Sequence, residues 1–129
     1  MESKDLRIGN LILIAYAGAE GKEWRQYPTK PEDISGIEWH PNDYKPIELT
    51  KEWILKFGFC FDKHSLKLTF NSLRFILFQI NASNDYNDNF NEFTVTVYQS
   101  KQSVEIARIR YVHQLQNLYY ALTSEDLSL

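Results

Sequence analysis

The stretch that decides the fold is EFTVTVYQSKQSVEIARIRYVHQLQNLYYAL, residues 92–122. Residues 92–99 alternate apolar and polar side chains, which is the period-two pattern of a strand with one buried face. Polar residues 99–103 turn the chain, and residues 104–110 return as a second, antiparallel strand. Residues 111–122 then place apolar side chains at helical spacing. Two antiparallel strands followed by a helix predict an α+β fold.

The helix predicted over residues 111–122 has no charged residue, although charged residues make up 24% of the chain. At about 100° per residue, an arc of about 120° collects the side chains expected to face the core: Tyr111, Val112, Leu115, Leu118, Tyr119 and Leu122. The opposite side presents neutral polar groups: His113, Gln116, Asn117 and Tyr120. Glu125 and Asp126 would oppose the helix dipole, so the helix is expected to end near Thr123.

The clearest local signal in the first half is TKEWILKFGF, residues 50–59. Thr50 is expected to cap the amino end of a two-turn helix, because its hydroxyl can accept an amide hydrogen of the first turn. Gly58 can take the left-handed conformation that ends a helix. A helix this short is stable only when docked. The side chains expected to dock it are Trp53, Ile54 and Phe57.

The remaining segments predict short strands separated by turns. Residues 6–16 are rich in aliphatic side chains and predict a strand, with a turn or bulge at Gly9 and Asn10. Glycine and proline residues predict loops at 17–24 and 26–33. Strands are predicted at 34–40, 65–70 and 73–80. A hairpin turn is predicted at Asn71 and Ser72, between the last two of these strands. Residues 81–91 are dominated by Asn and Asp, which favours a mobile loop.

Together these elements predict a single domain over residues 1–129. It is expected to contain a mostly antiparallel sheet of six or seven strands, a short central helix, and a C-terminal amphipathic helix packed on one face. Because 129 residues can bury about two thirds of the surface of the unfolded chain, a hydrophobic core is feasible without disulfides.

Composition narrows the class of protein. The net charge is −3 and neither half of the chain is basic, which argues against a broad nucleic-acid surface. One Cys allows no internal disulfide, and the polar N-terminus has no hydrophobic signal core. No apolar run reaches the roughly 20 residues that a membrane helix needs. We therefore expect a protein of the cytoplasm with no membrane contact.

No motif for a metal, a cofactor or catalysis is complete. Cys60 and His64 form half of a zinc pattern, with no second close pair. Residues 85–96 begin like a calcium loop but have Phe90 in place of the required Gly and Thr96 in place of the closing Glu. Residues 18–22, GAEGK, lack the spacing of a phosphate-binding loop. The sequence predicts no metal, no cofactor and no catalytic residue, although two of the 17 acidic residues could still meet in a carboxylate pair.

The neutral side of the closing helix is the remaining lead. Such a face is either an ordinary solvent-facing side or a contact surface, since interface cores are depleted in charge and enriched in Tyr. Under the second hypothesis, another protein or a second copy of the chain covers it, and His113 makes the contact sensitive to pH. The residues expected at this interface are His113, Gln116, Asn117 and Tyr120.

Three segments, LRIGNLI, YKPIELTKEWILKFGF and YVHQLQNLYYAL, together resemble a family of small uncharacterised proteins. Phages and integrated mobile elements of gut anaerobes carry this family. The resemblance covers both ends and the middle of the chain in the same order. It implies a phage or prophage accessory gene acting in the host cytoplasm, and it implies no activity, cofactor or catalytic residue.

The function predicted from these observations is that of a non-enzymatic protein-binding module, which could inhibit a host or defence factor. One alternative is an enzyme or small-ligand-binding domain, with a pocket between the polar helix face and the loop at 81–91. The other is binding of single-stranded nucleic acid by stacked aromatic side chains beside lysines and arginines. The aromatic and basic surface for that alternative is Trp24, Arg25, Tyr27 and Trp39.

Overall fold

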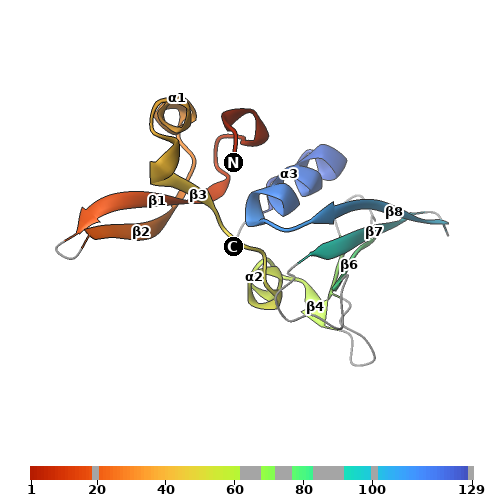
Figure 1. Cartoon of the computed structure of the whole chain (residues 1–129). Helices are drawn as coiled ribbons and strands as arrows, with labels where there is room; N and C mark the ends of the chain where they lie inside the picture. The colour runs from red at the N-terminus through yellow and green to blue at the C-terminus, as the bar shows by residue number, and fades with distance from the viewer. Residues whose placement is uncertain (19–20, 62–67, 72–76, 83–91, 100–101, 128–129) are drawn as a thin grey trace. The chain divides into compact units, whose positions relative to one another are not determined.

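The structure is a computed structural model that describes residues 1–18, 21–61, 68–71, 77–82, 92–99 and 102–127 (Figure 1). The chain divides into two units, one formed by residues 1–47 and 111–118 and the other by residues 48–110 and 119–129. We call them unit 1 and unit 2. Each unit has its own antiparallel sheet, so the α+β class and the antiparallel pairing are confirmed.

Unit 1 contains the sheet β2-β1-β3, built from β1 (Leu11–Gly18), β2 (Gly21–Pro28) and β3 (Tyr44–Pro46). β1 and β2 form a hairpin that stays in register from the pair Leu11 and Pro28 to the pair Gly18 and Gly21. Gly21 has a φ of +118°, a conformation that only glycine adopts without strain. The loops predicted at 17–24 and 26–33 are therefore wrong in large part, because cross-strand pairing includes residues 17–18 and 21–28, and residues 31–33 belong to a helix.

Helix α1 (Pro31–Trp39) covers one face of this sheet through a core of Leu6, Ile12 and Ile37. Ile14, Ile34 and Tyr44 pack against that core. Gly36 lies against the phenol of Tyr44, and a β-carbon at position 36 would collide with the phenol oxygen unless the Tyr44 side chain or the helix shifted.

The strand predicted at residues 34–40 is wrong, since these residues belong to α1 apart from His40. Pro31 stands at the first helical position, where its missing N–H costs no hydrogen bond. Asp33 Oδ2 accepts a hydrogen bond from the backbone N–H of Lys30 at 2.8 Å, which fixes the start of the helix. These start signals, within a proline-containing segment, outweigh the β-branched character of Ile34 and Ile37.

Two 3₁₀ turns complete unit 1: η1 (Ser3–Asp5) and η2 (Pro41–Asp43). The turn predicted at Gly9 is confirmed, with Gly9 at φ +94°. Asn10 behind it is buried, and its side chain accepts a hydrogen bond from the backbone N–H of Arg7 at 2.6 Å. This contact fixes the entry of the chain into β1.

Unit 2 contains an antiparallel sheet in the order β4-β5-β6-β7-β8. Its strands are β4 (Cys60–Phe61), β5 (Leu68–Asn71), β6 (Leu77–Ala82), β7 (Phe93–Gln99) and β8 (Gln102–Ile109). Phe93 and Val95 of β7 and Ile109 of β8 are buried, as the alternation in β7 predicts. The register between β7 and β8 shifts at Val95 and Thr96. Residues 81 and 82 of the predicted mobile loop belong to β6, and residues 83–91 lie outside the described part of the chain.

Helix α2 (Lys51–Lys56) begins and ends as the sequence predicts. Thr50 Oγ1 accepts a hydrogen bond from Trp53 N at 3.3 Å, and Gly58 has a φ of +97°. The side chains predicted to dock this helix are all buried: Trp53, Ile54 and Phe57.

Helix α3 (Val112–Thr123) confirms the predicted closing helix. Residues 111–118 belong to unit 1, and residues 119–123 belong to unit 2. Of the apolar arc, Val112, Leu115 and Tyr119 are buried. Thr123 Oγ1 donates to the carbonyl of Tyr119 at 2.8 Å, and Ser124 follows with a φ of 61°, which ends the helix at the predicted position.

The prediction of one sheet of six or seven strands is wrong. The strands of the described residues form two separate antiparallel sheets, and the helix α1 is added to the two helices that were expected. Of the turn expected at Asn71 and Ser72, Asn71 is the last residue of β5, and Ser72 lies outside the described part of the chain.

Candidate functional site

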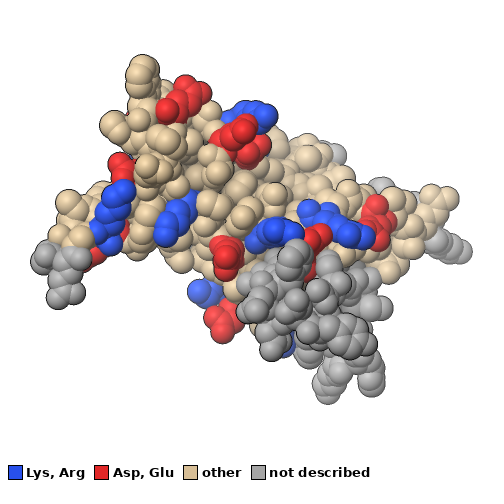
Figure 2. All heavy atoms as spheres, in the orientation of Figure 1, with Lys and Arg blue, Asp and Glu red and all other residues tan. Residues whose placement is uncertain are grey.

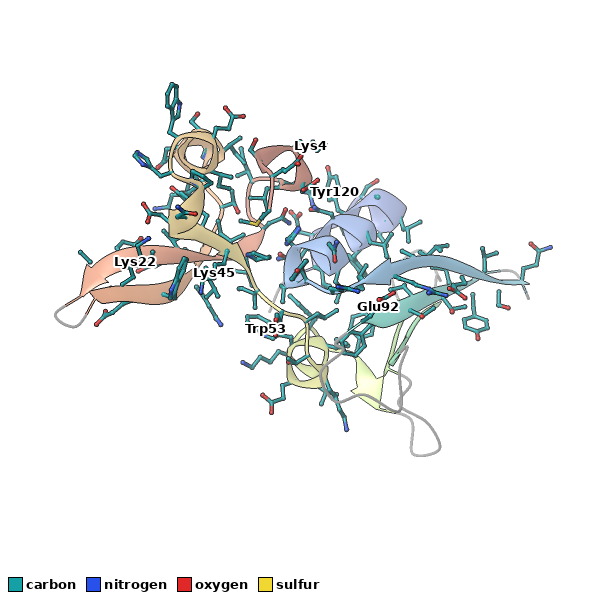
Figure 3. The ribbon with its side chains drawn as sticks, in the orientation of Figure 1. Lys4, Lys22, Lys45, Trp53, Glu92 and Tyr120 are labelled. Carbon is teal, nitrogen blue, oxygen red and sulfur yellow. The ribbon has the colours of Figure 1, made fainter. Side chains whose placement is uncertain are left out.

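The polar side of α3 lies deeper than its sequence suggested. His113 and Gln116 have exposed fractions of only 4% and 7%, and Asn117 is partly buried. Tyr120 is 40% exposed and is labelled on α3 in Figure 3. The outward position expected for this side therefore holds only for Tyr120, and a partner could not reach His113 and Gln116 in this conformation.

The two amides on this side hold the N-terminal segment of unit 1. Gln116 Oε1 accepts a hydrogen bond from the backbone N–H of Leu11 at 2.9 Å, at the first residue of β1. Asn117 Nδ2 donates to the backbone carbonyl of Asp5 in η1 at 2.9 Å. Burying a neutral amide with a partner costs far less than burying a charge, which explains why this side of α3 carries no Lys or Glu.

His113 is stacked on the ring of Tyr111, with ring centres 5.8 Å apart and planes 8° from parallel. Burial lowers the pKa of His113, the Asp5 carboxylate opposes this by raising it, and the N-terminal ammonium group lowers it further. The imidazole is therefore neutral at neutral pH. Its Nδ1 and the Oδ1 of Asn117 are buried without a hydrogen-bond partner in the protein.

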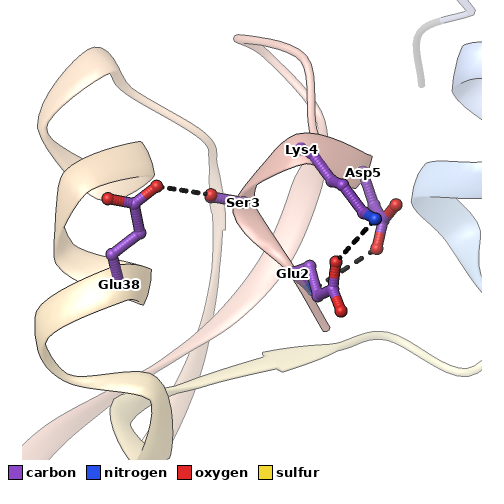
Figure 4. A network of polar contacts seen from close by, with 5 residues as sticks. All are labelled: Glu2, Ser3, Lys4, Asp5 and Glu38. Carbon is purple, nitrogen blue, oxygen red and sulfur yellow. Dashed lines mark hydrogen bonds and ion pairs between the residues drawn. The ribbon is translucent and has the colours of Figure 1, made fainter.

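A small polar network keeps η1 on α1 (Figure 4). Ser3 Oγ donates to Glu38 Oε1 at 3.0 Å, and Glu2 N donates to Asp5 Oδ2 at 3.4 Å. Lys4 Nζ and Glu2 Oε2 form an ion pair at 3.0 Å, but both side chains are largely exposed, so water screens the pair. The network therefore helps to position η1, whose Asp5 carbonyl also accepts the hydrogen bond from Asn117.

The β1–β2 hairpin presents aromatic rings with cations over them. Arg25 lies over the ring of Tyr16 at 5.4 Å, and Tyr16 contacts Tyr27 with ring centres 5.6 Å apart. Lys45 of β3 places its Nζ 3.9 Å from the centre of the Trp24 ring. Cations prefer such positions because the face of an aromatic ring is electron-rich.

Strand register divides these side chains between two faces of the sheet. Ile12, Ile14 and Tyr16 share a face, and their partners on β2 are Tyr27, Arg25 and Glu23 in that order. Trp24 is paired with Ala15 and therefore points to the opposite face, as does Lys45 opposite Leu13. We call Tyr16, Arg25 and Tyr27 the hairpin cluster.

The four residues predicted as one aromatic and basic surface are thus not placed together on one face. Arg25 and Tyr27 belong to the hairpin cluster, Trp24 lies on the other face, and Trp39 is the last residue of α1, where it is 79% exposed. Tyr16 is the member of the hairpin cluster that the sequence does not predict. Its place beside Arg25 and Tyr27 depends on the register of the hairpin, and the loop predicted at 17–24 gives no register.

Carboxylates neutralise the cations of this region. Lys22 Nζ lies 3.0 Å from Asp43 Oδ1, and Arg25 Nη2 lies 3.1 Å from Glu23 Oε2. Figure 2 shows Lys and Arg interspersed with Asp and Glu on the face drawn, without a large area of one sign. Figure 3 labels Lys22 and Lys45 on the strands of unit 1. This charge pattern does not suit a surface that follows a phosphate backbone.

No group of three or more His, Cys, Asp or Glu side chains that could hold a metal ion occurs within the described residues. His64 and residues 85–91 of the incomplete zinc and calcium patterns lie outside those residues. None of the described helices combines the length and apolar composition required to cross a bilayer.

Comparison with known proteins gave no match to a family model, to a curated protein or to a solved structure. The resemblance to proteins of phages and mobile elements therefore stays a prediction.

Proposed function

We propose that the chain is a non-enzymatic protein-binding module, and that the hairpin cluster is its main contact surface. The observation that carries this proposal is the arrangement of Tyr16, Arg25 and Tyr27 on one face of a regular hairpin. Tyr16 is 40% exposed, and Arg25 lies over its ring at 5.4 Å.

Tyr and Arg are the side chains that most often dominate the energy of protein interfaces, together with Trp. On paired strands the backbone is already ordered, so a partner that covers them has to order only the side chains. Trp39, at 79% exposure, is a further aromatic side chain of unit 1 that a partner could cover.

The charge balance supports a protein over a nucleic acid as the partner. Glu23 neutralises Arg25, so a phosphate approaching the hairpin cluster would also meet a carboxylate. A protein surface that offers both apolar and polar groups meets no such repulsion. The small-ligand alternative would have used residues 83–91, which lie outside the described residues, and no observation on unit 1 favours it.

The setting of this function comes from the resemblance. A phage or prophage accessory protein in a host cytoplasm would use such a surface to cover a host or defence factor and inhibit it. A second copy of the chain is the other partner that the proposal allows.

The test compares the wild-type protein with the double variant Tyr16→Thr, Arg25→Ala. The matched control is Gln26→Thr, an exposed position on the same strand whose side chain points to the opposite face. Each tagged protein is used to isolate partners from host lysate, and each purified partner is then titrated by calorimetry. We expect binding to fall at least tenfold in the double variant and to stay unchanged in the control.

Two results would contradict the proposal. One is equal affinity of the folded double variant and the wild type for the purified partner. The other is binding to single-stranded nucleic acid that weakens steeply with salt while no protein partner is retained, which would restore the nucleic-acid alternative.

A further inference from the structure

The outer edge of β2 is a long, regular strand edge of unit 1. The order β2-β1-β3 leaves one side of β2 without a neighbouring strand among the described residues. β2 pairs with β1 over its whole length without a shift in register, and only two of its eight residues are even partly buried. Alternate residues of such a strand turn their N–H and C=O groups outward, so this edge can add one more strand.

The other edges of the two described sheets have features that discourage such pairing. β3 has three residues and ends in Pro46, and β4 has two residues. The pairing of β8 with β7 changes register at Val95 and Thr96, and an irregularity of this kind disturbs an edge. Natural sheets protect their edges against other chains in these ways. Residues 21–27 of β2 carry none of these features.

Charged side chains also protect a strand edge, and β2 carries three of them: Lys22, Glu23 and Arg25. The side chain of Lys22 is held at η2, where its Nζ lies 3.0 Å from Asp43 Oδ1 and donates to the carbonyl of Asn42 at 3.4 Å. Glu23 and Arg25 remain, and their effect depends on the residues that they would meet in an added strand.

A second copy of β2 suits these two charges in one register. Opposite residues of an antiparallel pair turn their backbone groups the same way, so two identical strands pair even-numbered residues with even-numbered ones. Two such registers overlap over nearly the whole strand, one centred on Trp24 and the other on Arg25. A register centred on Arg25 brings two guanidinium groups together, which destabilises the pair. A register centred on Trp24 places Glu23 of each copy opposite Arg25 of the other.

The four charges of this register alternate in sign. Within one copy, Arg25 Nη2 lies 3.1 Å from Glu23 Oε2, and both side chains are more than half exposed. The two side chains share a face of the sheet because they are two residues apart on a strand. A guanidinium group has five N–H donors, so Arg25 can bind the carboxylates of both copies. Lys22 would stand opposite Gln26, which is neutral.

We propose that two copies of the chain pair antiparallel along β2, with the two-fold axis at Trp24. The two three-stranded sheets then form one continuous sheet, and the interface is the same surface on both copies. This interface differs from the proposed contact surface, and it needs no other protein. It also brings two hairpin clusters to the same face of the joined sheet, because opposite residues of paired strands point to the same side.

Exchange of the two charges tests the pairing and its register together. In Glu23→Arg both positions are positive, and in Arg25→Glu both are negative, so like charges meet when either variant pairs with itself. A mixture of the two variants places opposite charges together at both positions. We expect each variant alone to dimerise at least tenfold more weakly than the wild type, and the equimolar mixture to regain the wild-type affinity. Sedimentation velocity of the full chain over a concentration series measures both.

The matched controls are Glu32→Arg and Lys51→Glu, which make the same changes in net charge at exposed positions outside β2. Each should dimerise like the wild type, and circular dichroism checks that every variant is folded. A wild-type protein that stays monomeric at millimolar concentration would overturn the proposal. So would folded β2 variants that dimerise like the wild type, or a mixture that does not regain the dimer. These measurements contain no other protein, so their outcome is separate from that of the partner-binding test.

Discussion

Gln116 and Leu11 are 105 residues apart in the sequence, yet Gln116 Oε1 accepts the backbone hydrogen of Leu11 at 2.9 Å. The contact joins the middle of α3 to the first residue of β1. A side chain expected to meet a partner therefore serves as an internal connection of unit 1. The same holds for Asn117, whose amide binds the carbonyl of Asp5.

Replacement of Gln116 by Leu removes the acceptor for Leu11 N–H and keeps an apolar stem of similar size. We expect the free energy of unfolding to fall by about 1 kcal/mol, because the partly buried N–H of Leu11 loses its hydrogen-bond partner. Urea denaturation measures this loss, and hydrogen exchange at Leu11 should accelerate. The control is Ala121→Ser at an exposed position of the same helix, which should stay within about 0.5 kcal/mol of wild type. Equal stability of both variants would contradict the role of Gln116.

The stability of the protein should depend on pH through His113. Because burial in the folded protein lowers the pKa of this imidazole below its ordinary value of 6.5, the unfolded chain binds more protons just below that pH. Stability therefore rises with pH through this window and is complete above it. Asp5 opposes the shift, and the N-terminal ammonium group adds to it.

Thermal midpoints between pH 5.5 and 7.5 measure this dependence. The variant His113→Asn should flatten the difference across the window, whereas His40→Asn should keep it, because His40 is exposed. If His113→Asn retains the full wild-type slope, the dependence comes from other groups.

Substitution of Gly36 by Ala should force either the Tyr44 side chain or α1 to shift. The added β-carbon meets the phenol of Tyr44, and overpacking of this kind costs about 1–3 kcal/mol. Tyr44→Phe removes the colliding oxygen together with its 3.3 Å hydrogen bond to Asp33 Oδ1. We therefore expect Gly36→Ala to cost less in the Tyr44→Phe background. A double-mutant cycle by chemical denaturation gives this coupling, and additive costs would show that the collision is relieved elsewhere.

The start of α2 offers a test within unit 2. Thr50→Ala removes the hydroxyl that accepts Trp53 N–H at 3.3 Å, which should reduce stability by about 0.5–2 kcal/mol. Thr50→Ser keeps a hydroxyl and should restore most of the loss. Lys51→Ala changes an exposed neighbour and serves as the control. Equal stabilities for the Ala and Ser variants would mean that the cap contributes nothing in solution.

Local signals predicted the elements that depend on local chemistry. Thr50 and Gly58 bound α2, and the alternation of Phe93, Val95 and the threonines between them defines β7. The helix α1 was not predicted because Pro31 and Gly36 are residue types that are common in turns. The contact that fixes the start of the helix, from Lys30 N–H to Asp33 Oδ2, is visible only in the structure. The division into two sheets was missed because strand order depends on contacts between residues far apart in the sequence.

For the candidate site, the sequence showed that the polar side of α3 carries no charge, but not whether this side faces a partner or the interior of the protein. Neutral amides suit either a partner surface or an internal contact with backbone groups. Deciding between these requires knowing that Asp5 and Leu11 lie beside Gln116 and Asn117, which no local pattern shows. The hairpin cluster was missed for a related reason, since the neighbourhood of Tyr16 and Arg25 depends on cross-strand register.

Unit 1 is assembled from residues 1–47 together with residues 111–118. During synthesis, the first 47 residues leave the ribosome without the amides that will anchor Leu11 and Asp5. Those amides emerge only after the whole of β4 to β8 has been translated. The N-terminal part therefore lacks these two contacts until residues 116 and 117 have been translated, and a chain released before residue 116 would never form them.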